Sequence, residues 1–317
     1  GPIKDKEVFI GILRAGGYLN LDSHDELAWL AELSQNYPNE QFRVGLRVNF
    51  DIASVCPQEE MASEEGGRFG YCYENGVLEQ TIRQIERLSN VTIAGLHLHT
   101  STQSRSVRVY EELAGMAVKI ASEFQLRLSY VDMGGGYFGG RSDKPGYKEY
   151  FQAIGARLAQ CFSPAETRLI VEPGISLISR AITFETVVKD IKDIRDHKFV
   201  VTDGSRVNLN PLVTRHFYPH HIVYQDDGPS DDRAIEASQW VCGFTCMEYD
   251  RLFEIKEGKG LRCGDRIIYD TAGGYTMGLT PLFINYFPAV IVEQAAGDFF
   301  VAREAWGNDE YLQKNHY

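Results

Sequence analysis

The chain has 317 residues, 44% hydrophobic and 24% charged, so it is long enough to bury a large core. Its net charge of −12 and scattered basic residues argue against nucleic acid or anionic membrane surfaces as main partners. No apolar run reaches the roughly 18–20 residues of a membrane span. The six cysteines lack the spacing of a zinc site or a disulfide framework. We therefore expect a cytoplasmic chain with reduced thiols.

The first half of the chain alternates helical and extended patterns. Val8, Ile12 and Leu13 fit one face of a short helix that ends at Gly16 and Gly17. Further helical patterns cover residues 27–33, 78–88, 109–120 and 150–158, and strands are expected near residues 18, 43, 92, 127 and 168. Strict alternation of this kind predicts a parallel sheet with helices outside it.

After Gly174 the pattern changes to strands with few helices between them. These strands are expected over residues 182–188, 199–202, 222–224, 235–241, 266–269, 290–292 and 299–302. The sequence therefore predicts an α/β domain over residues 1–180 and an antiparallel β domain over residues 181–317. Five βα units do not close a (β/α)8 barrel, which usually needs roughly 250 residues. An open doubly wound sheet is the alternative.

Polar side chains or glycines occupy four of the predicted strand ends. They are Arg47 in LRVN, His99 in GLHLHT, Gly134 to Gly136 in VDMGGGYFGG, and Glu172 in VEPG. In a barrel these ends converge on one mouth, and glycines after a strand can bring backbone N–H groups against a phosphate. Together the four would suit an aromatic phosphate cofactor. Taken singly, each also fits an ordinary role as an ion pair, a buried histidine or a turn.

With these motifs, the sequence resembles the pyridoxal-phosphate decarboxylases of alanine-racemase fold, the group that contains diaminopimelate, ornithine and arginine decarboxylases. The resemblance covers nearly the whole chain. Its motifs occur in the family's order: GPIK, LDSHDEL, LRVN, RFG, GLHLHT, VDMGGGYFGG, VEPG, VVTDGS, GFTCMEYD and GDRIIYDTAGGYT. The resemblance implies a barrel that binds pyridoxal 5'-phosphate, a C-terminal β domain, and a homodimer with shared active sites.

The resemblance also implies roles for individual residues. His99 would stack on the cofactor ring, and Arg47 would meet its phenolic oxygen. Glu172 would keep the pyridine nitrogen protonated, so that the ring accepts the electrons released with CO₂. Cys246 matches the cysteine that the partner subunit donates to protonate or orient the carbanion. The phosphate would be held by Gly134, Gly135, Gly136, Gly174, Ile175 and Tyr275.

The chain departs from the family at its front. The family's Schiff-base lysine lies on the first barrel strand, whereas the GPIK motif at Gly1 follows the third. We therefore expect the natural protein to carry an N-terminal segment with three more strands and this lysine. Such a segment would complete the barrel, of which the five predicted strands would be the last five.

Two further departures concern the substrate. The family's EPGR motif ends here in Ile175, and the acidic residue after the cysteine is replaced by Met247. A distal ammonium would lose its counter-charge, worth about 2–5 kcal/mol for a buried pair, so diaminopimelate, lysine and ornithine should be poor substrates. Relatives gather substrate contacts where this chain has Arg215, His216, His220 and His221. These would suit an acidic or acylated distal group, such as the citryl-amino acids of siderophore assembly, unless they form an exposed loop.

Two other functions compete with decarboxylation. An amino-acid racemase of this fold would place an arginine, not Glu172, at the pyridine nitrogen. A non-catalytic paralogue that regulates or dimerises with an active enzyme is favoured by the missing lysine and by Ile175. It is opposed by the retained His99, Glu172, Cys246 and Tyr275.

Overall fold

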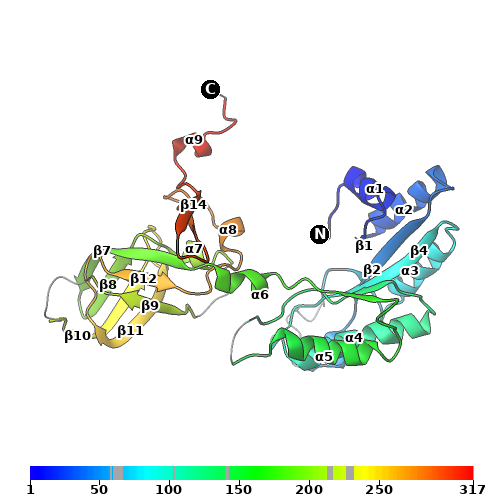
Figure 1. Ribbon diagram of the computed structural model, residues 1–317, viewed down its shortest axis with the longest axis horizontal. Coiled ribbons are helices and arrows are strands. Elements are labelled where there is room, and N and C mark those ends of the chain that lie inside the picture. The colour runs from blue at the N-terminus through cyan, green and yellow to red at the C-terminus, as the bar shows by residue number, and fades with distance from the viewer. Residues whose placement is uncertain are drawn as a thin grey trace. The chain divides into compact units, whose positions relative to one another are not determined.

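The computed structural model describes residues 1–57, 59, 67–102, 104–139, 143–212, 217–225 and 232–316. The chain divides into two compact units, Gly1–Leu177 and Ile178–Tyr317 (Figure 1). The short helix α6 (Ile175–Ile178) spans the junction. The first unit holds a parallel sheet with its helices, and the second holds the other strands of the described residues.

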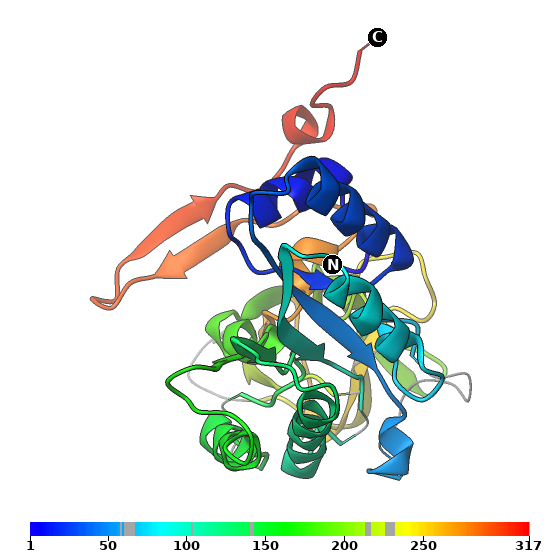
Figure 2. The same ribbon diagram turned by 90° about the vertical axis from the view of Figure 1, so that its right-hand side faces the viewer.

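The first unit alternates strands and helices around a parallel sheet. The sheet contains β1 (Asn20–Leu21), β2 (Phe42–Asn49), β3 (Tyr71–Cys72), β4 (Val91–Leu98), β5 (Tyr130–Asp132) and β6 (Arg168–Ile170). Its order is β1-β2-β4-β5-β6, with β3 paired to β2. The helices α1 (Lys6–Arg14), α2 (His24–Asn36), α3 (Val77–Glu86), α4 (Val107–Glu123) and α5 (Tyr147–Leu158) form an arc around the strands in Figure 2. The five expected strands are present, and β3 is an additional strand of two residues.

The strands of this sheet turn apolar side chains to one face and polar side chains to the other. Leu46, Leu96 and Val131 are fully buried in the core that the helices cover. Arg47, His97 and Asp132 each follow one of these residues. Because successive strand residues point to opposite faces, they lie on the inner face of the sheet.

On the inner face, the side chain of Tyr130 lies over two glycines of the neighbouring strands. Gly45 pairs with Gly95, and Gly95 pairs with Tyr130, so the three residues lie side by side on β2, β4 and β5. A Cβ atom would lie 2.2 Å from the Tyr130 hydroxyl at Gly45 and 2.1 Å from its Cζ at Gly95. The buried ring therefore requires glycine at both positions, and its hydroxyl donates to Asn20 Oδ1 at 2.7 Å.

The buried face of α1 differs from the expected one. The helix buries Phe9 and Leu13, whereas Val8 is 56% and Ile12 is 37% exposed. Phe9 packs edge-on against Trp29, with the ring centroids 5.7 Å apart. Phe9 and Leu13 are four residues apart, as Val8 and Ile12 are, but each lies one residue later in the helix. This later pair faces the core. The prediction named Leu13 correctly and the other two residues wrongly.

The second unit contains a six-stranded sheet in the order β11-β10-β8-β7-β12-β9. Its strands are β7 (Phe184–Ile194), β8 (His197–Thr202), β9 (His220–Val223), β10 (Ile235–Cys242), β11 (Arg251–Lys259) and β12 (Arg266–Tyr269). The pairs are antiparallel except for β8 and β10, which run parallel. The strand β11 was not predicted from the sequence, because the second half of its segment RLFEIKEGK is mostly charged and contains a glycine.

Smaller elements complete this unit. The strands β13 (Val290–Glu293) and β14 (Phe299–Arg303) form a separate hairpin. The helices α7 (Arg206–Leu209), α8 (Thr276–Leu279) and α9 (Asn308–Tyr311) have four residues each. Val200, Val241 and Ile267 lie at the centre of the unit's own hydrophobic core. A membrane-spanning helix would have to be longer and more apolar than any helix in the described part of the chain.

Candidate active site

The polar side chains of the inner face line one cavity at the carboxyl ends of the strands. The cavity has a volume of about 540 Å³, and its lining includes Asn20, Asp22, Arg47, His97, His99 and Glu172. A second cavity of about 600 Å³ lies near Arg43 and Arg168, at the beginnings of β2 and β6. It contains none of the predicted site residues. The chemistry expected from the sequence therefore belongs to the first cavity.

Arg47 is fixed by its neighbours but keeps a donor for a ligand. Its Nη1 donates to Asp22 Oδ2 at 3.0 Å, and Asp22 Oδ1 in turn accepts from the backbone N–H of Gly70 at 2.6 Å. The guanidinium lies 4.4 Å from the ring centroid of Phe69. Its buried Nε has no hydrogen-bond partner among the described residues. Arg47 therefore offers the cavity an oriented cation.

His99 and the glycine turn after β5 hold each other in place. The backbone N–H of Gly135 donates to Nδ1 of His99 at 3.2 Å, which leaves the ring proton of a neutral imidazole on Nε2. Burial lowers the pKa of His99, and the positive charge of Arg47 lowers it further. Gly134 has φ = +60°, and a Cβ there would lie 2.5 Å from the Cβ of His99. His99 is thus an uncharged ring held against backbone.

The glycine turn also packs tightly against the segment that carries Glu172. The N–H of Glu172 donates to the Gly134 carbonyl at 2.7 Å, and a Cβ at Gly135 would lie 2.3 Å from the Glu172 carbonyl oxygen. Gly136 and Gly174 both have positive φ values, +91° and +51°. Two backbone segments without side chains therefore meet beside His99. Such an arrangement fits a phosphate held by backbone N–H groups.

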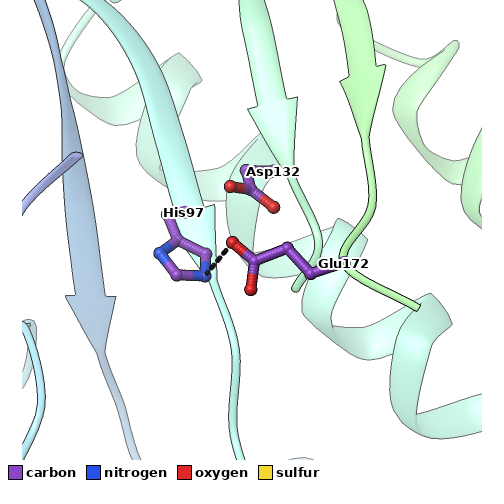
Figure 3. A group of neighbouring side chains, drawn as sticks. All are labelled: His97, Asp132 and Glu172. Carbon is purple, nitrogen blue, oxygen red and sulfur yellow. Dashed lines mark ion pairs between the residues drawn. The ribbon is translucent and has the colours of Figure 1, made fainter. Parts of the chain in front are cut away.

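Glu172 belongs to a cluster with His97 and Asp132, whose side chains point toward one another in Figure 3. Their donor and acceptor atoms lie within 4.8 Å of one another, and His97 Nε2 is 4.0 Å from Glu172 Oε1. Burial and the charge of Asp132 raise the pKa of Glu172, while Arg47 opposes that rise. Burial lowers the pKa of His97 to about 4 despite the attraction of Asp132.

The sequence analysis missed His97 and Asp132 as site residues. Asp132 is 4% exposed and His97 is 7% exposed, so both are buried polar side chains. Each stands two residues before a predicted site residue, His99 or Gly134. Residues two apart in a strand point to the same face, so this spacing would have found them.

Three predicted residues of the second unit, Cys246, Met247 and Tyr275, lie in two loops. Cys246 is an exposed free thiol, and Met247 Sδ accepts a hydrogen bond from the Tyr249 hydroxyl at 2.9 Å. Both cysteine and methionine belong to the loop between β10 and β11. Tyr275 is half exposed and adopts φ = +64°, a strained value for a residue that is not glycine. Strain of this kind is typical of functional positions.

Of the four predicted substrate-contact residues between positions 215 and 221, the structure describes two. Arg215 and His216 lie outside the described residues. His220 and His221 belong to β9 rather than to an exposed loop. His220 stacks on Phe253 with ring centroids 3.9 Å apart, and His221 Nδ1 lies 3.5 Å from Asp270 Oδ2.

The residues of the first cavity fit pyridoxal phosphate. Arg47 supplies a cation with an unpartnered buried donor, and His99 supplies an uncharged ring. Glu172 is a carboxyl group that can share a proton with a pyridine nitrogen. The paired glycine segments supply backbone without side chains beside these groups. A cofactor that combines an aromatic nitrogen, a phenolic oxygen and a phosphate matches this set.

Comparisons with known proteins agree with this fit. Residues 3–179 match the family described as pyridoxal-dependent decarboxylase, pyridoxal binding domain. Diaminopimelate decarboxylase of Actinosynnema pretiosum is 26% identical over 96% of the chain and 70% of its own length. Antizyme inhibitor 2 of Xenopus laevis is 24% identical over 90% of the chain and 62% of its own length. The chain spans between 56 and 70% of the length of these relatives and of a carboxynorspermidine/carboxyspermidine decarboxylase of Herminiimonas arsenicoxydans.

Solved structures show the same fold. Diaminopimelate decarboxylase of M. jannaschii has a TM-score of 0.82 at 22% identity, covering all of this chain and 73% of that one. Arginine decarboxylase of Paramecium bursaria Chlorella virus has a TM-score of 0.70 at 18% identity, covering 89% of this chain and 73% of that one. The expected fold, the strands of a TIM-type barrel followed by a β domain, is confirmed. The family match covers more than half of the chain, which therefore belongs to the pyridoxal-dependent decarboxylases.

Proposed function

We propose that the complete protein decarboxylates an amino acid with the help of pyridoxal 5'-phosphate. The observation that carries this proposal is the convergence of Arg47, His99 and Glu172 on one cavity. When bound, the cofactor supplies a ring that accepts the electrons released with CO₂. Arg47 would balance the charge of a phenolic oxygen, and His99 would present its ring face. Glu172 would hold the proton at the pyridine nitrogen.

Other residues of the chain would complete the site. Gly134, Gly135 and Gly136, the backbone of Gly174 and Ile175, and the hydroxyl of Tyr275 would hold the phosphate. The Cys246 thiol would deliver or orient the proton that replaces the lost carboxylate. Its exposure in the β10–β11 loop supports this role, because a thiol must reach the substrate to act on it.

We propose a substrate with a modified or acidic distal end, such as a citryl-amino acid of siderophore assembly. Met247 supports this choice, because a thioether offers no negative charge to a distal ammonium. Arg215 and His216 would provide the matching positive or donor groups. Loss of a buried counter-charge costs about 2–5 kcal/mol, so plain diamino acids should react far more slowly.

The test is CO₂ release by the full natural protein, loaded with pyridoxal phosphate, from a panel of amino acids. We expect the highest kcat/KM with acylated diamino acids and little activity with ornithine, lysine or diaminopimelate. The Met247→Asp variant should raise kcat/KM for the plain diamino acids, and Met247→Leu is its uncharged control. Efficient turnover of diaminopimelate by the unmodified enzyme would contradict the proposed specificity.

A non-catalytic paralogue is the second candidate function. It is favoured by the match to a relative named Antizyme inhibitor 2, a name that describes inhibition rather than decarboxylation. The two candidates differ in one measurement. A protein that binds pyridoxal phosphate and releases no CO₂ from any acylated or plain amino acid would be a regulator or a dimer partner.

We propose a cytoplasmic homodimer whose active sites combine residues of two subunits. The six free cysteines support a reducing compartment. The test mixes Cys246→Ala and Glu172→Gln variants, each inactive by itself. If the subunits supply these residues to one site, mixed dimers hold one intact site, and about a quarter of the wild-type activity should return on random mixing. Recovery of no activity would contradict the shared site.

A further inference from the structure

Asp132 is a buried carboxylate to which the proposed function gives no role. Its Oδ1 accepts from the backbone N–H of Gly134 at 3.0 Å, and its Oδ2 accepts from Nδ2 of Asn20 at 3.2 Å. Two donors that cannot leave favour the charged form of a carboxyl group. Asp132 is therefore held in place by two fixed donors on the inner face of the sheet.

The carboxyl group of Glu172 is held less firmly than that of Asp132. Its side chain is half exposed to the cavity, and its acceptor atoms lie within 4.8 Å of those of Asp132 and His97. Two carboxylates this close repel each other, which favours a proton on one of them. Asp132 has two fixed donors, whereas the described residues offer the Glu172 side chain no comparable donor. The proton is therefore favoured on Glu172.

The charged and titratable groups around Glu172 come from several elements. Asp132 faces it from β5, His97 from β4, His99 from the residue after β4, and Arg47 from β2. Asp22 follows β1 and pairs with Arg47. Arg47 is the main opposing group. Its charge is already shared with Asp22 at 3.0 Å, which reduces its pull on Glu172.

We infer that Asp132 is a positioning residue that keeps a proton on Glu172 while the site holds no cofactor. His97 lies beside Asp132 and Glu172 as an uncharged ring. Its buried Nε2 has no hydrogen-bond partner among the described residues. The proton on Glu172 can pass to an unprotonated ring nitrogen of a ligand, leaving a carboxylate beside a cationic ring. Only the identity of that ligand rests on the proposed function. The sharing of the proton does not.

The test follows the infrared C=O band of protonated carboxyl groups while the cofactor-free chain is titrated with pH. We expect a band that persists above the ordinary pH range of a glutamate. Glu172→Gln should remove it and so assign it. Asp132→Asn keeps the size and an acceptor for Gly134 but removes the charge, and should move the band to lower pH by about one unit or more. Asp232→Asn, which changes an exposed carboxyl group of the second unit, is the control and should leave the band in place.

Two outcomes overturn the inference: a wild-type band that titrates in the ordinary glutamate range, or a band that Asp132→Asn does not move. If Asp132→Asn does not fold, the wild-type band, assigned through Glu172→Gln, decides by itself. Binding of pyridoxal phosphate is followed separately by fluorescence quenching. If the full natural protein shows the expected band but fails to bind pyridoxal phosphate, the inference stands and the proposed function is refuted.

Discussion

An uncharged imidazole lies beside two carboxyl groups at the centre of the site. Asp132 attracts a proton toward His97, but burial outweighs that attraction and lowers the pKa of His97 from 6.5 to about 4. At neutral pH the 4.0 Å approach of His97 to Glu172 is therefore not an ion pair. His97 shapes the cavity without adding charge to it.

This neutral histidine makes the stability of the first unit sensitive to acid. Between pH 6.5 and about 4 the unfolded chain binds a proton at this residue and the folded chain does not, so acidification favours unfolding. The lowered pKa corresponds to a loss of about 3 kcal/mol in the free energy of unfolding over this pH interval. Urea unfolding at pH 7 and pH 4.5 measures it. We expect His97→Gln to lose less stability over this interval than the wild type.

The raised pKa of Glu172 acts in the opposite direction, because the folded chain then binds the extra proton. That contribution is present in both proteins, so the difference between them reports on His97. Equal losses of stability in the wild type and His97→Gln would show that His97 is not buried in its neutral form.

At the scale of elements, two glycines illustrate opposite requirements of a turn and a helix. Gly134 has a positive φ and no room for a Cβ beside His99, whereas Gly155 lies inside α5 with nothing within 4 Å. We expect Gly134→Ala to destabilise the chain and to weaken pyridoxal phosphate binding at least about tenfold, since His99 must move. Gly155→Ala should stabilise it by about 0.5–1 kcal/mol. Thermal unfolding and fluorescence titration measure both effects, and unchanged binding in Gly134→Ala would contradict the role of the turn.

The loop that carries Cys246 depends on one buried carboxylate. Asp250 accepts hydrogen bonds from the Ser205 hydroxyl, the Arg206 N–H, and the N–H and hydroxyl of Thr245, at 2.6–3.2 Å. A Cβ at Gly243 would lie 2.2 Å from its Oδ2, so the loop closes tightly over it. Asp250 therefore joins the β10–β11 loop to the segment before α7.

Asp250→Asn should release this loop, because an amide nitrogen cannot accept a hydrogen bond. It would lose the three bonds to Oδ2 or the one bond to Oδ1. We expect a loss of about 1–3 kcal/mol per unsatisfied group and a changed rate of Cys246 alkylation, measured by mass spectrometry of the labelled peptide. The surface variant Asp232→Asn, which removes an exposed pair with Arg262, should leave the stability nearly unchanged. An alkylation rate equal to that of the wild type would contradict a loop held by Asp250.

Elements with strong periodicity could be predicted from the sequence, and short or atypical ones could not. The alternation of strands and helices gave the parallel sheet, but β3 has only two residues and β11 loses its pattern halfway. At the site, strand ends with unusual residues indicated Arg47, His99 and Glu172. Asp132 and His97 lie inside strands, and the register of β4 and β5 places them side by side. Their spacing of two residues from Gly134 and His99 was the signal that could have found them. The roles assigned to Cys246, Met247 and Tyr275 stay predictions.

At the scale of the whole molecule, the hairpin of β13 and β14 carries a large exposed apolar surface. Ile291 pairs with Val301, and Phe299 stands two residues before Val301 on the same face of β14. Phe299 is 67% exposed and Ile291 is 61% exposed. Contiguous apolar surface of this kind is typical of protein interfaces. Together with the proposed homodimer, it leads us to expect a second copy of the chain on this face.

The double variant Phe299→Ser and Val301→Ser should weaken that dimer. Burial of each large apolar side chain contributes about 1.5–3 kcal/mol, so the variant should sediment as a monomer at concentrations where the wild type is dimeric. Phe300 points to the other face of the hairpin, and Phe300→Ser is the control that should stay dimeric. A double variant that remains a dimer would place the interface elsewhere.

The ring of Tyr130 and the bare backbone of Gly45 and Gly95 occupy adjoining space on three neighbouring strands. These three positions therefore cannot vary independently over evolution. A lineage that gained a side chain at residue 95 would need a smaller residue at 130 at nearly the same time. Among sequences that share this sheet, we expect paired changes at these positions and few single ones. The packing of one ring would thus be recorded as a correlation between distant columns of an alignment.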